Sequence, residues 1–317
     1  MPSSSIDVHA IQNVRCLVVG AGGFIGTALC ETLQTYGAQV YGFGREPRFP
    51  SVFEDINFIK GDFLAPSCLK EATKNIDVVF HLISTTLPAS SNKRKLFDVE
   101  SNLLGTIKLL ECCLDNDVKK VVFISSGGTV YGSCNASSID ESQPTNPICS
   151  YGIVKLAIEK YLSLFHHLHG LDYAVLRVSN PFGPFQIAQN NQGIIATIFS
   201  RAITNQPFTV WGDGTIIRDY IYIYDVVDAM VRAALYSGSY QLFNVGSNLG
   251  RSILNLIQEI QLITDKNIDI HFEAGRSVDI PRNVLANDLI CQELGWLPAV
   301  DFSDGLQKTY DWLTQRI

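Results

Sequence analysis

The sequence predicts an α/β fold built on a doubly wound parallel sheet, with a smaller and partly interleaved second part toward the C-terminus. Three observations predict this fold. Short apolar runs alternate with amphipathic helical patterns up to Asn180, the first run ends in a cluster of glycines, and beyond Asn180 the alternation loosens as proline and glycine become more frequent. Continuous apolar strands separated by helices are typical of a parallel sheet that is covered on both faces.

The expected elements follow one another in a regular order. Strands are expected at 15–21, 38–44, 56–63, 77–84, 118–126 and 171–180. Helical patterns between them run over 25–37, 101–116 and 151–169. The first expected domain holds the sheet and comprises 1–179 with a returning segment at about 208–247. The second expected domain comprises 180–207 and 248–317.

Composition and charge exclude several classes of protein. The 317 residues are 46% apolar and 17% charged, which indicates a globular chain. A net charge of −7 argues against a general nucleic-acid or membrane-surface binder. No apolar run approaches the roughly 18 residues of a membrane-spanning helix, and the N-terminus lacks the pattern of a signal peptide. We therefore expect no nucleic-acid and no membrane partner.

The cysteines and histidines give no indication of a metal site. The eight cysteines are scattered without C-x-x-C spacing, and most lie inside apolar patterns, which predicts reduced core cysteines in a cytoplasmic protein. His166, His167 and His169 come just before Gly170, where a solvated helix end explains them better than a metal site.

The first expected turn carries a glycine pattern. "GAGGFIG" places Gly20, Gly23 and Gly26 directly after a strand, and Phe24 and Ile25 open the helix that follows. Glycines at these positions permit a tight turn and let the backbone approach a pyrophosphate at the helix N-terminus. The context of strand, turn and helix therefore predicts a dinucleotide site.

The end of the second expected strand bears on which dinucleotide binds. An acidic residue there would bind the ribose 2′-hydroxyl of NAD, whereas this chain has Gly44 followed by Arg45 and Arg48. An arginine would accept the 2′-phosphate of NADP, so NAD and NADP both stay open. Asp62, after the third strand, is the expected partner of the adenine amino group.

Three residues suggest proton-transfer chemistry. Tyr151 and Lys155 are four apart and therefore project from one face of a helix. The lysine charge, together with an oxidised nicotinamide, is expected to lower the tyrosine pKa from its usual value near 10 and to make the phenolate accessible. Ser126, at the end of the fifth strand, would hydrogen-bond the reacting oxygen.

These motifs together resemble the extended short-chain dehydrogenase/reductase family, in particular its nucleotide-sugar epimerases, reductases and dehydratases. "LVVGAGGFIG", "FISSGGTVYG", "SYGIVKLAIE", "NPFGP", "WGDGTIIRDYIYIYDVVDA" and "FNVGS" occur in the family's order, from about residue 14 to 313. The resemblance implies a Rossmann-type NAD(P)-binding domain and a C-terminal substrate-binding domain. It also implies a homodimer, formed by the helices at about 101–116 and 151–169.

The resemblance assigns a role to each candidate residue. Tyr151 is expected to be the catalytic base, with Lys155 ordering the tyrosine and the nicotinamide ribose, and Asn102 is expected to support the active-site helix. The expected cofactor-binding residues are Gly20, Gly23, Phe24, Ile25, Gly26, Gly44, Arg45, Asp62, Phe63, Leu82, Ile83, Ser84, Asn102, Ile124, Tyr151 and Lys155. The expected substrate-binding residues are Thr86, Ser126, Gly127, Tyr151, Asn180, Arg218 and Arg276, of which the two arginines would clamp a diphosphate.

The chain departs from the family pattern at one position. Many relatives place the catalytic serine or threonine four residues before the tyrosine of "VYG", where this chain has Gly127. The hydroxyl is then expected from Ser126, with Thr129 and Ser125 as alternatives. The family's 4,6-dehydratases need a Thr-Asp-Glu cluster here, so a dehydratase is not expected.

The expected reaction is redox chemistry at C4 of a nucleotide-diphosphate sugar. One interpretation is an epimerase that passes through a transient 4-keto sugar with bound NAD. The alternative is an NAD(P)H-dependent reductase of a nucleotide-linked 4-keto hexose, since the same residues serve both. A non-catalytic NAD(P)-binding scaffold is a third hypothesis, and only Gly127 favours it.

Overall fold

A seven-stranded parallel sheet forms the centre of the fold. The computed structural model describes residues 6–134, 136–188, 193–275 and 280–316. In spatial order the strands are β10 (Leu242–Val245), β6 (Asp172–Val178), β5 (Lys120–Ser126), β4 (Val78–His81), β1 (Arg15–Val19), β2 (Gln39–Gly44) and β3 (Asn57–Lys60). The chain winds outward in both directions from β1 and β4, which confirms the predicted doubly wound fold.

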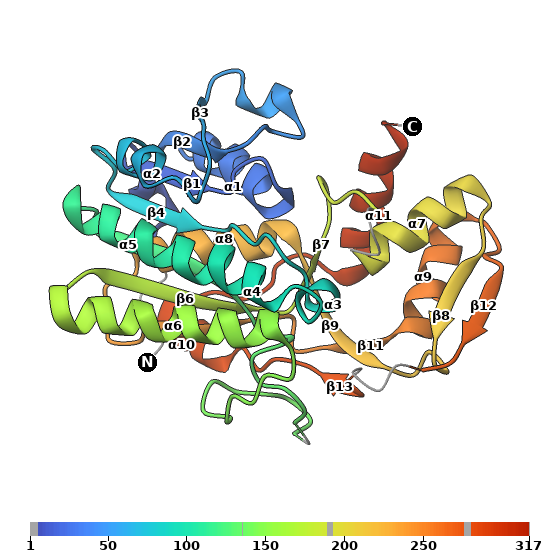
Figure 1. Ribbon diagram of the computed structural model, residues 1–317. Coiled ribbons are helices and arrows are strands. Elements are labelled where there is room, and N and C mark those ends of the chain that lie inside the picture. The colour runs from blue at the N-terminus through green and yellow to red at the C-terminus, as the bar shows by residue number, and fades with distance from the viewer. Residues whose placement is uncertain (1–5, 135, 189–192, 276–279, 317) are drawn as a thin grey trace.

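Helices bury both faces of this sheet (Figure 1). Successive residues of β1 point to opposite faces, so that Cys16 and Val18 join one apolar cluster whereas Leu17 and Val19 join another. The first cluster packs against α1 (Phe24–Thr35) and α8 (Ile223–Leu235), and the second against α2 (Pro66–Ala72), α5 (Gly105–Asp115) and α6 (Ser150–His169). Within the described ranges, no helix combines the length and apolar character needed to cross a membrane.

A C-terminal lobe stands beyond the carboxyl ends of the large sheet's strands, at the right of Figure 1. It holds two small sheets: β9 (Ile217–Tyr222) pairs with β7 (Asn180–Phe182), β11 (Gly250–Ser252) and β13 (Arg282–Asn283), and β8 (Phe208–Trp211) pairs with β12 (Ile270–Glu273). Its helices are α7 (Ile194–Thr204), α9 (Ile253–Thr264) and α11 (Phe302–Thr314), whereas α10 (Asp288–Leu294) packs against α8 and β10 of the large sheet. The chain returns from this lobe to the large sheet through α8 and β10.

Short helices connect β4 to α5 on the side of the molecule that carries α6. They are α3 (Pro88–Ser91), α4 (Lys95–Asp98) and the π-helix η3 (Val99–Leu104), which runs directly into α5. The helix expected over 101–116 is therefore a π-helical turn followed by an α-helix. Two 3-10 turns, η1 (Val8–Ile11) and η2 (Pro50–Phe53), complete the described elements.

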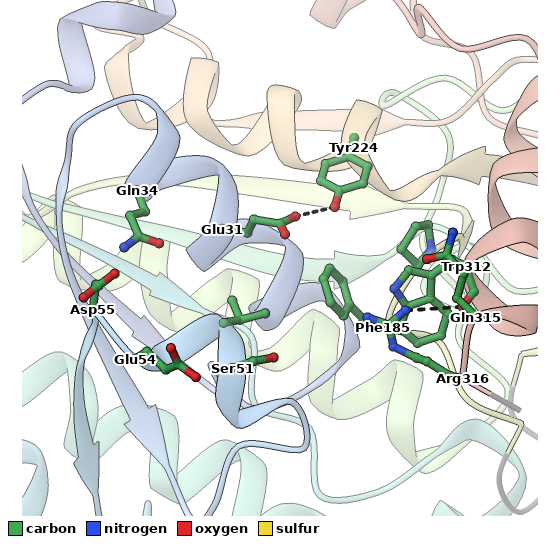
Figure 2. Close-up of a pocket in the computed structure, with 12 residues that line it drawn as sticks. Glu31, Gln34, Ser51, Glu54, Asp55, Phe185, Tyr224, Trp312, Gln315 and Arg316 are labelled. Carbon is green, nitrogen blue, oxygen red and sulfur yellow. Dashed lines mark hydrogen bonds between the residues drawn. The ribbon is translucent and has the colours of Figure 1, made fainter.

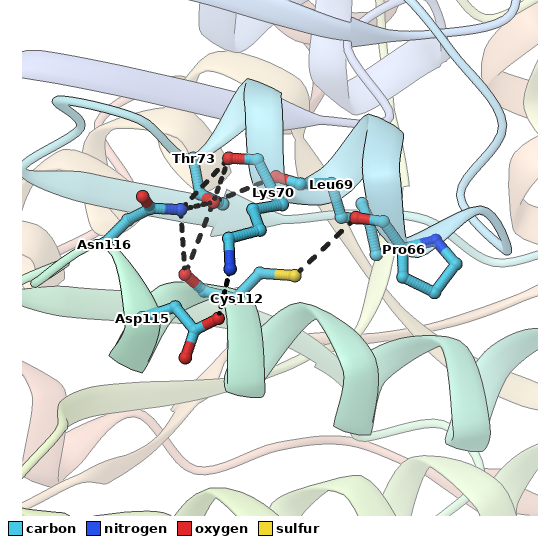
Figure 3. A network of polar contacts seen from close by, with 7 residues as sticks. All are labelled: Pro66, Leu69, Lys70, Thr73, Cys112, Asp115 and Asn116. Carbon is cyan, nitrogen blue, oxygen red and sulfur yellow. Dashed lines mark hydrogen bonds and ion pairs between the residues drawn. The ribbon is translucent and has the colours of Figure 1, made fainter.

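A polar network holds α2 against α5, as Figure 3 shows. The side-chain amide of Asn116 donates to the carbonyls of Lys70, at 3.0 Å, and Cys112, at 3.2 Å, and to the hydroxyl of Thr73, at 2.8 Å. Lys70 also forms a 2.9 Å ion pair with Asp115. These bonds add donors to carbonyl groups in the last turns of both helices, where intrahelical partners run out.

Candidate active site

The glycine turn after β1 fits a dinucleotide's pyrophosphate. Gly20 has φ of 98°, in the left-handed region that favours glycine. A Cβ atom on Gly26 would lie 2.3 Å from the Gly20 carbonyl oxygen, so a larger residue would push the helix off the strand. No side chain caps α1 at Gly23, which leaves that helix N-terminus to an anion. The turn is therefore a cradle of backbone groups, as the sequence predicts.

The ends of β2 and β3 carry the residues that are expected to contact the nucleoside of the cofactor. Arg45 is exposed directly after Gly44, and Glu46 forms a 2.5 Å ion pair with Lys60. Asp62 is exposed, and one oxygen of its carboxylate accepts from the Leu64 amide at 3.0 Å. The side chain of Phe63 is buried, 5.4 Å between ring centroids from His81, so that side chain packs in the core and the predicted cofactor contact of this residue stays a prediction.

The segment after β4 passes close to the glycine turn. A Cβ atom on Gly20 would lie 3.1 Å from the backbone nitrogen of Ile83, and Leu82 donates to the Val19 carbonyl at 2.9 Å. The hydroxyl of Ser84 donates to the Thr86 carbonyl at 3.0 Å, and Ser84 lies near the phenol of Tyr151, whose pKa it lowers. This stretch therefore links the predicted cofactor cradle to the catalytic tyrosine.

Tyr151 and Lys155 lie together on the first turns of α6. The ammonium nitrogen of Lys155 lies 5.7 Å from the centre of the Tyr151 ring. It donates to the Ile124 carbonyl at 2.8 Å and lies 4.6 Å from the centre of the Phe123 ring, and the residue is only 4% exposed. Lys155 is thus fixed against β5, the strand that ends in Ser126.

Burial sets the protonation of this pair. It raises the pKa of Tyr151 to about 12, although Ser126 and Ser84 act in the opposite direction. Burial also lowers the pKa of Lys155 to about 7, while the charges of Glu159 and Asp98 favour the ammonium form. Burial is the largest influence on the Tyr151 pKa, and the expected lowering by Lys155 together with an oxidised nicotinamide stays a prediction.

A buried carboxylate that the sequence reading missed holds the start of α6. Asp98 is fully buried and accepts from the hydroxyls of Ser150, at 2.7 Å, and Thr86, at 2.6 Å, and from the amide of Asn102, at 2.9 Å. Thr86 therefore belongs to this network, which corrects its predicted contact with substrate. Asn102 supports the active-site helix through Asp98, and the only signal in the sequence is that the two are four residues apart.

The three candidates for the catalytic hydroxyl, Ser126, Ser125 and Thr129, differ in their hydrogen-bond partners. Ser126 lies near the Tyr151 phenol and lowers its pKa. Ser125 is buried and donates to Glu159 at 2.5 Å, so its hydroxyl is committed elsewhere. The Thr129 hydroxyl is buried and has no partner among the described residues. The geometry therefore favours Ser126.

Gly127 is buried and its backbone groups are already paired, and its predicted contact with substrate stays a prediction. Its amide donates to the Val178 carbonyl at 2.9 Å, and its carbonyl accepts from the side chain of Asn283 at 3.1 Å.

The predicted substrate residues of the C-terminal lobe lie on adjacent strands. Asn180 on β7 donates to the Asp219 carbonyl at 2.8 Å. Arg218 on β9 donates from one guanidinium nitrogen to the carbonyls of Ile280, at 2.6 Å, and Ile217, at 2.9 Å. Arg276 lies outside the described residues. The structure thus brings Asn180 and Arg218 near each other on one small sheet.

A separate hollow of about 490 Å³ lies between α1, η2, α8 and α11 (Figure 2). Tyr224 donates to Glu31 on its wall, and Phe185 and Trp312 pack edge to face at 5.5 Å. None of the predicted site residues lines it. The hollow is therefore distinct from the candidate active site.

Comparison with known proteins agrees with this geometry. The model of the NAD dependent epimerase/dehydratase family matches residues 16–246. The UDP-glucose 4-epimerase of Mycolicibacterium smegmatis is 33% identical over 96% of this chain and 99% of its own, and the dTDP-4-dehydro-6-deoxyglucose reductase of Escherichia coli is 31% identical over 92% and 95%.

Solved structures of related enzymes are similar over almost the whole chain. UDP-glucose 4-epimerase of Thermotoga maritima, solved with UDP-glucose, has a TM-score of 0.92 at 28% identity and covers 96% of this chain and 99% of its own. The enzyme of Thermus thermophilus, solved with NAD, has a TM-score of 0.89 at 29% identity and covers 96% and 100%. The predicted resemblance, Rossmann-type fold and NAD-dependent enzyme are thereby confirmed. Since the matched model spans well over half of the sequence, the chain belongs to the NAD dependent epimerase/dehydratase family.

Proposed function

We propose that the protein is a nucleotide-sugar 4-epimerase that works with bound NAD. One observation carries this proposal: Tyr151, Ser126 and the buried Lys155 meet at the carboxyl end of the parallel sheet, next to the glycine turn. The relatives named as UDP-glucose 4-epimerases support it, because they match nearly the full length of the chain.

In this proposal Tyr151 transfers the proton, and Lys155 and Ser126 hold the tyrosine in place. NAD, when bound, supplies the acceptor and later the donor of the hydride at sugar C4, and its oxidised form brings a positive charge to the site. Tyr151 as phenolate takes the proton of the C4 hydroxyl, and Ser126 donates a hydrogen bond to the same oxygen. Once the 4-keto sugar has presented its other face, Tyr151 returns the proton to the new alcohol.

The C-terminal lobe would hold the nucleotide end of the substrate. Asn180 and Arg218 are the described residues proposed to contact the sugar and the diphosphate. Residues 180–207 and 248–317 are the proposed substrate-binding domain, and 1–179 with 208–247 the proposed NAD-binding domain. A guanidinium group suits phosphate oxygens because it offers two parallel donors.

A reductase of a nucleotide-linked 4-keto hexose is the second candidate. The end of β2 favours it, because Gly44 offers no carboxylate to the ribose and the exposed Arg45 suits a 2′-phosphate. One relative is named as a dTDP-4-dehydro-6-deoxyglucose reductase. Here Tyr151 would donate its proton once, to the oxygen of the preformed ketone.

Cofactor content and turnover distinguish the two candidates. An epimerase is expected to release NAD on denaturation and to convert UDP-glucose into its C4 epimer without added cofactor. Tyr151→Phe should lower this turnover by about 10²–10⁴-fold while the fold, followed by circular dichroism, stays intact. A protein that retains no NAD, but oxidises NADPH when given a nucleotide-linked 4-keto sugar, would be the reductase.

We also propose a homodimer that assembles through α4, η3 and α6. These elements carry exposed apolar side chains, among them Leu96, Val99, Leu104, Ile153, Leu164 and Leu168. Leu96 is 80% exposed, which is costly for a side chain that stays in water. Light scattering should give twice the chain mass of 35.0 kDa, and Leu164→Glu should give the monomer, whereas Leu262→Glu on α9 should not. A wild-type monomer at micromolar concentration would contradict the dimer.

A cytoplasmic location completes the proposal. All eight cysteines are free thiols, and four of them are buried in the core. Reduced cysteines of this kind are typical of proteins kept in a reducing compartment.

A further inference from the structure

The turn that presents Ser126 is held by a strand of the C-terminal lobe. Asn283 lies on β13, 156 residues further along the chain, and its side-chain amide donates to the Gly127 carbonyl at 3.1 Å. The amide of Gly127 donates to the Val178 carbonyl at 2.9 Å on the other side. The peptide groups that flank Gly127 are therefore fixed from two directions, immediately after Ser126.

Leu285, two residues beyond Asn283, also packs against the turn at Gly127. A Cβ atom on Gly127 would lie 2.4 Å from a methyl carbon of Leu285, and Leu285 is fully buried. The backbone amide of Leu285 donates to the buried carboxylate of Asp219 at 3.2 Å. The contact therefore explains why position 127 holds glycine and no hydroxyl, and it leaves Ser126 as the last side chain before the turn.

The burial of Asn283 shows that its amide serves this contact. Asn283 is 1% exposed, and its side-chain oxygen has no hydrogen-bond partner among the described residues. Burying an unpaired amide oxygen costs free energy. The hydrogen bond from the Asn283 amide nitrogen to the Gly127 carbonyl is the polar contact of this side chain that offsets the cost. β13 also pairs with β9 so that Asn283 lies beside Arg218, the proposed diphosphate ligand.

We propose that Asn283 is a positioning residue for the reaction, which holds the Gly127–Gly128 peptide and thereby the turn after Ser126, so that the Ser126 hydroxyl points at the reacting oxygen beside Tyr151. The proposal rests on the function proposed above. It assigns to the C-terminal lobe a part in aligning the catalytic hydroxyl, in addition to its proposed part in substrate binding. A small displacement of an aligned group lowers a rate strongly, because the reacting atoms must be placed within a fraction of an ångström.

A double-mutant cycle tests this proposal. Asn283→Ala should lower kcat by about ten- to a hundredfold and change KM for UDP-glucose by less than about twofold. In a Ser126→Ala background the same change should cost no further kcat, because the hydroxyl it aligns is absent. An equal loss in both backgrounds, or no loss in either, would overturn the proposal.

Asn287→Ala is the matched control. Asn287, the N-cap residue of α10, is also buried, and its side-chain amide donates to a glycine carbonyl, that of Gly246, at the same 3.1 Å. It should lower stability to a similar extent and leave kcat close to wild type. If Asn283→Ala does not fold, Asn283→Ser, which keeps a shorter donor, enters the same cycle with the same expected outcome.

Hydrogen exchange separates a failure of this inference from a failure of the proposed function. Deuterium uptake by the peptide over 124–131 should rise in Asn283→Ala and stay unchanged in Asn287→Ala, whether or not any sugar is turned over. If the uptake rises and the wild type converts no nucleotide sugar, the proposed function is wrong and the anchoring stands. If the wild type is active and the uptake does not change, the anchoring is wrong.

Discussion

Glu159 binds Arg177 through both carboxylate oxygens one helical turn beyond Lys155. The guanidinium nitrogens lie 2.6 and 3.1 Å from these oxygens, and both side chains are only 4% exposed. Ser125 adds a third hydrogen bond to the same carboxylate. A buried and paired carboxylate thus lies beside Lys155, where its charge favours the ammonium form of the lysine against the effect of burial.

Removing that charge should shift the pH dependence of the reaction. Lys155 is faced by Glu159 on its own helix, by Asp98 from α4 and by the buried His81 from β4. Since the carboxylate raises the lysine pKa, Glu159→Gln should move it below about 7. The pH–rate profile of kcat/KM should then lose activity at a lower pH on its alkaline side.

The exposed Glu111→Gln is the matched control for this change and should leave the profile in place. The Arg177 charge that loses its partner would shift the lysine pKa in the same downward direction. An alkaline limb that stays fixed in Glu159→Gln, or moves to higher pH, would show that Glu159 does not control the charge of Lys155.

Cofactor preference should respond to a carboxylate at the end of β2. A Cβ atom on Gly44 would meet only a ring carbon of Phe58 at 3.7 Å, so an aspartate fits there without strain. Its carboxylate would bind a ribose 2′-hydroxyl and repel a 2′-phosphate. Gly44→Asp should therefore raise the ratio of the NADP Kd to the NAD Kd by about tenfold or more, measured by fluorescence titration.

Gln39→Glu adds the same charge at the opposite end of β2 and should leave this ratio unchanged. If Gly44→Asp changes neither Kd, the ribose does not lie beside Gly44.

The sheet and the catalytic residues could be predicted because their signals are local. Each of the six expected strands is present within a few residues of its expected bounds, since an apolar run between glycines and helices is encoded in consecutive positions. The strand β10 was not predicted as a separate strand because it lies beyond Asn180, where the alternation of apolar runs and helical patterns loosens. Tyr151 and Lys155 could be predicted because their spacing of four residues places both side chains on one face of a helix.

The groups that hold this site in place could not be predicted, because they come from distant parts of the chain. Asp98 binds Ser150 across 52 residues, and Asn283 binds Gly127 across 156. The effect of burial on the Tyr151 pKa could not be predicted for a related reason. Spacing indicates that a lysine is near, but only the packed structure shows how strongly burial disfavours the phenolate.

The polar network between α2 and α5 should contribute measurably to stability. Asn116→Ala removes three hydrogen bonds and leaves the carbonyl of Lys70 and the hydroxyl of Thr73 without that donor. The loss in free energy of unfolding should be about 1–3 kcal/mol, seen as a lower urea midpoint at unchanged slope. Asn57→Ala, at an exposed position on the edge strand β3, should change the midpoint little.

Position 127 should reject the hydroxyl that many relatives carry there. A side chain in Gly127→Ser would collide with Leu285, whose methyl carbon lies 2.4 Å from the Cβ position, and the variant should lose about 1–3 kcal/mol of stability. Gly128→Ser is the control, since a Cβ atom there would meet only the Ser126 hydroxyl at 3.8 Å.

Leu285→Ala should relieve that collision. On its own it should cost about 2–5 kcal/mol, because it leaves a cavity in a fully buried site. The double variant Gly127→Ser with Leu285→Ala should be less destabilised than the sum of the two single changes, as measured by urea unfolding, because the serine occupies part of that cavity. Effects that add within about 0.5 kcal/mol would mean that another contact excludes side chains from position 127.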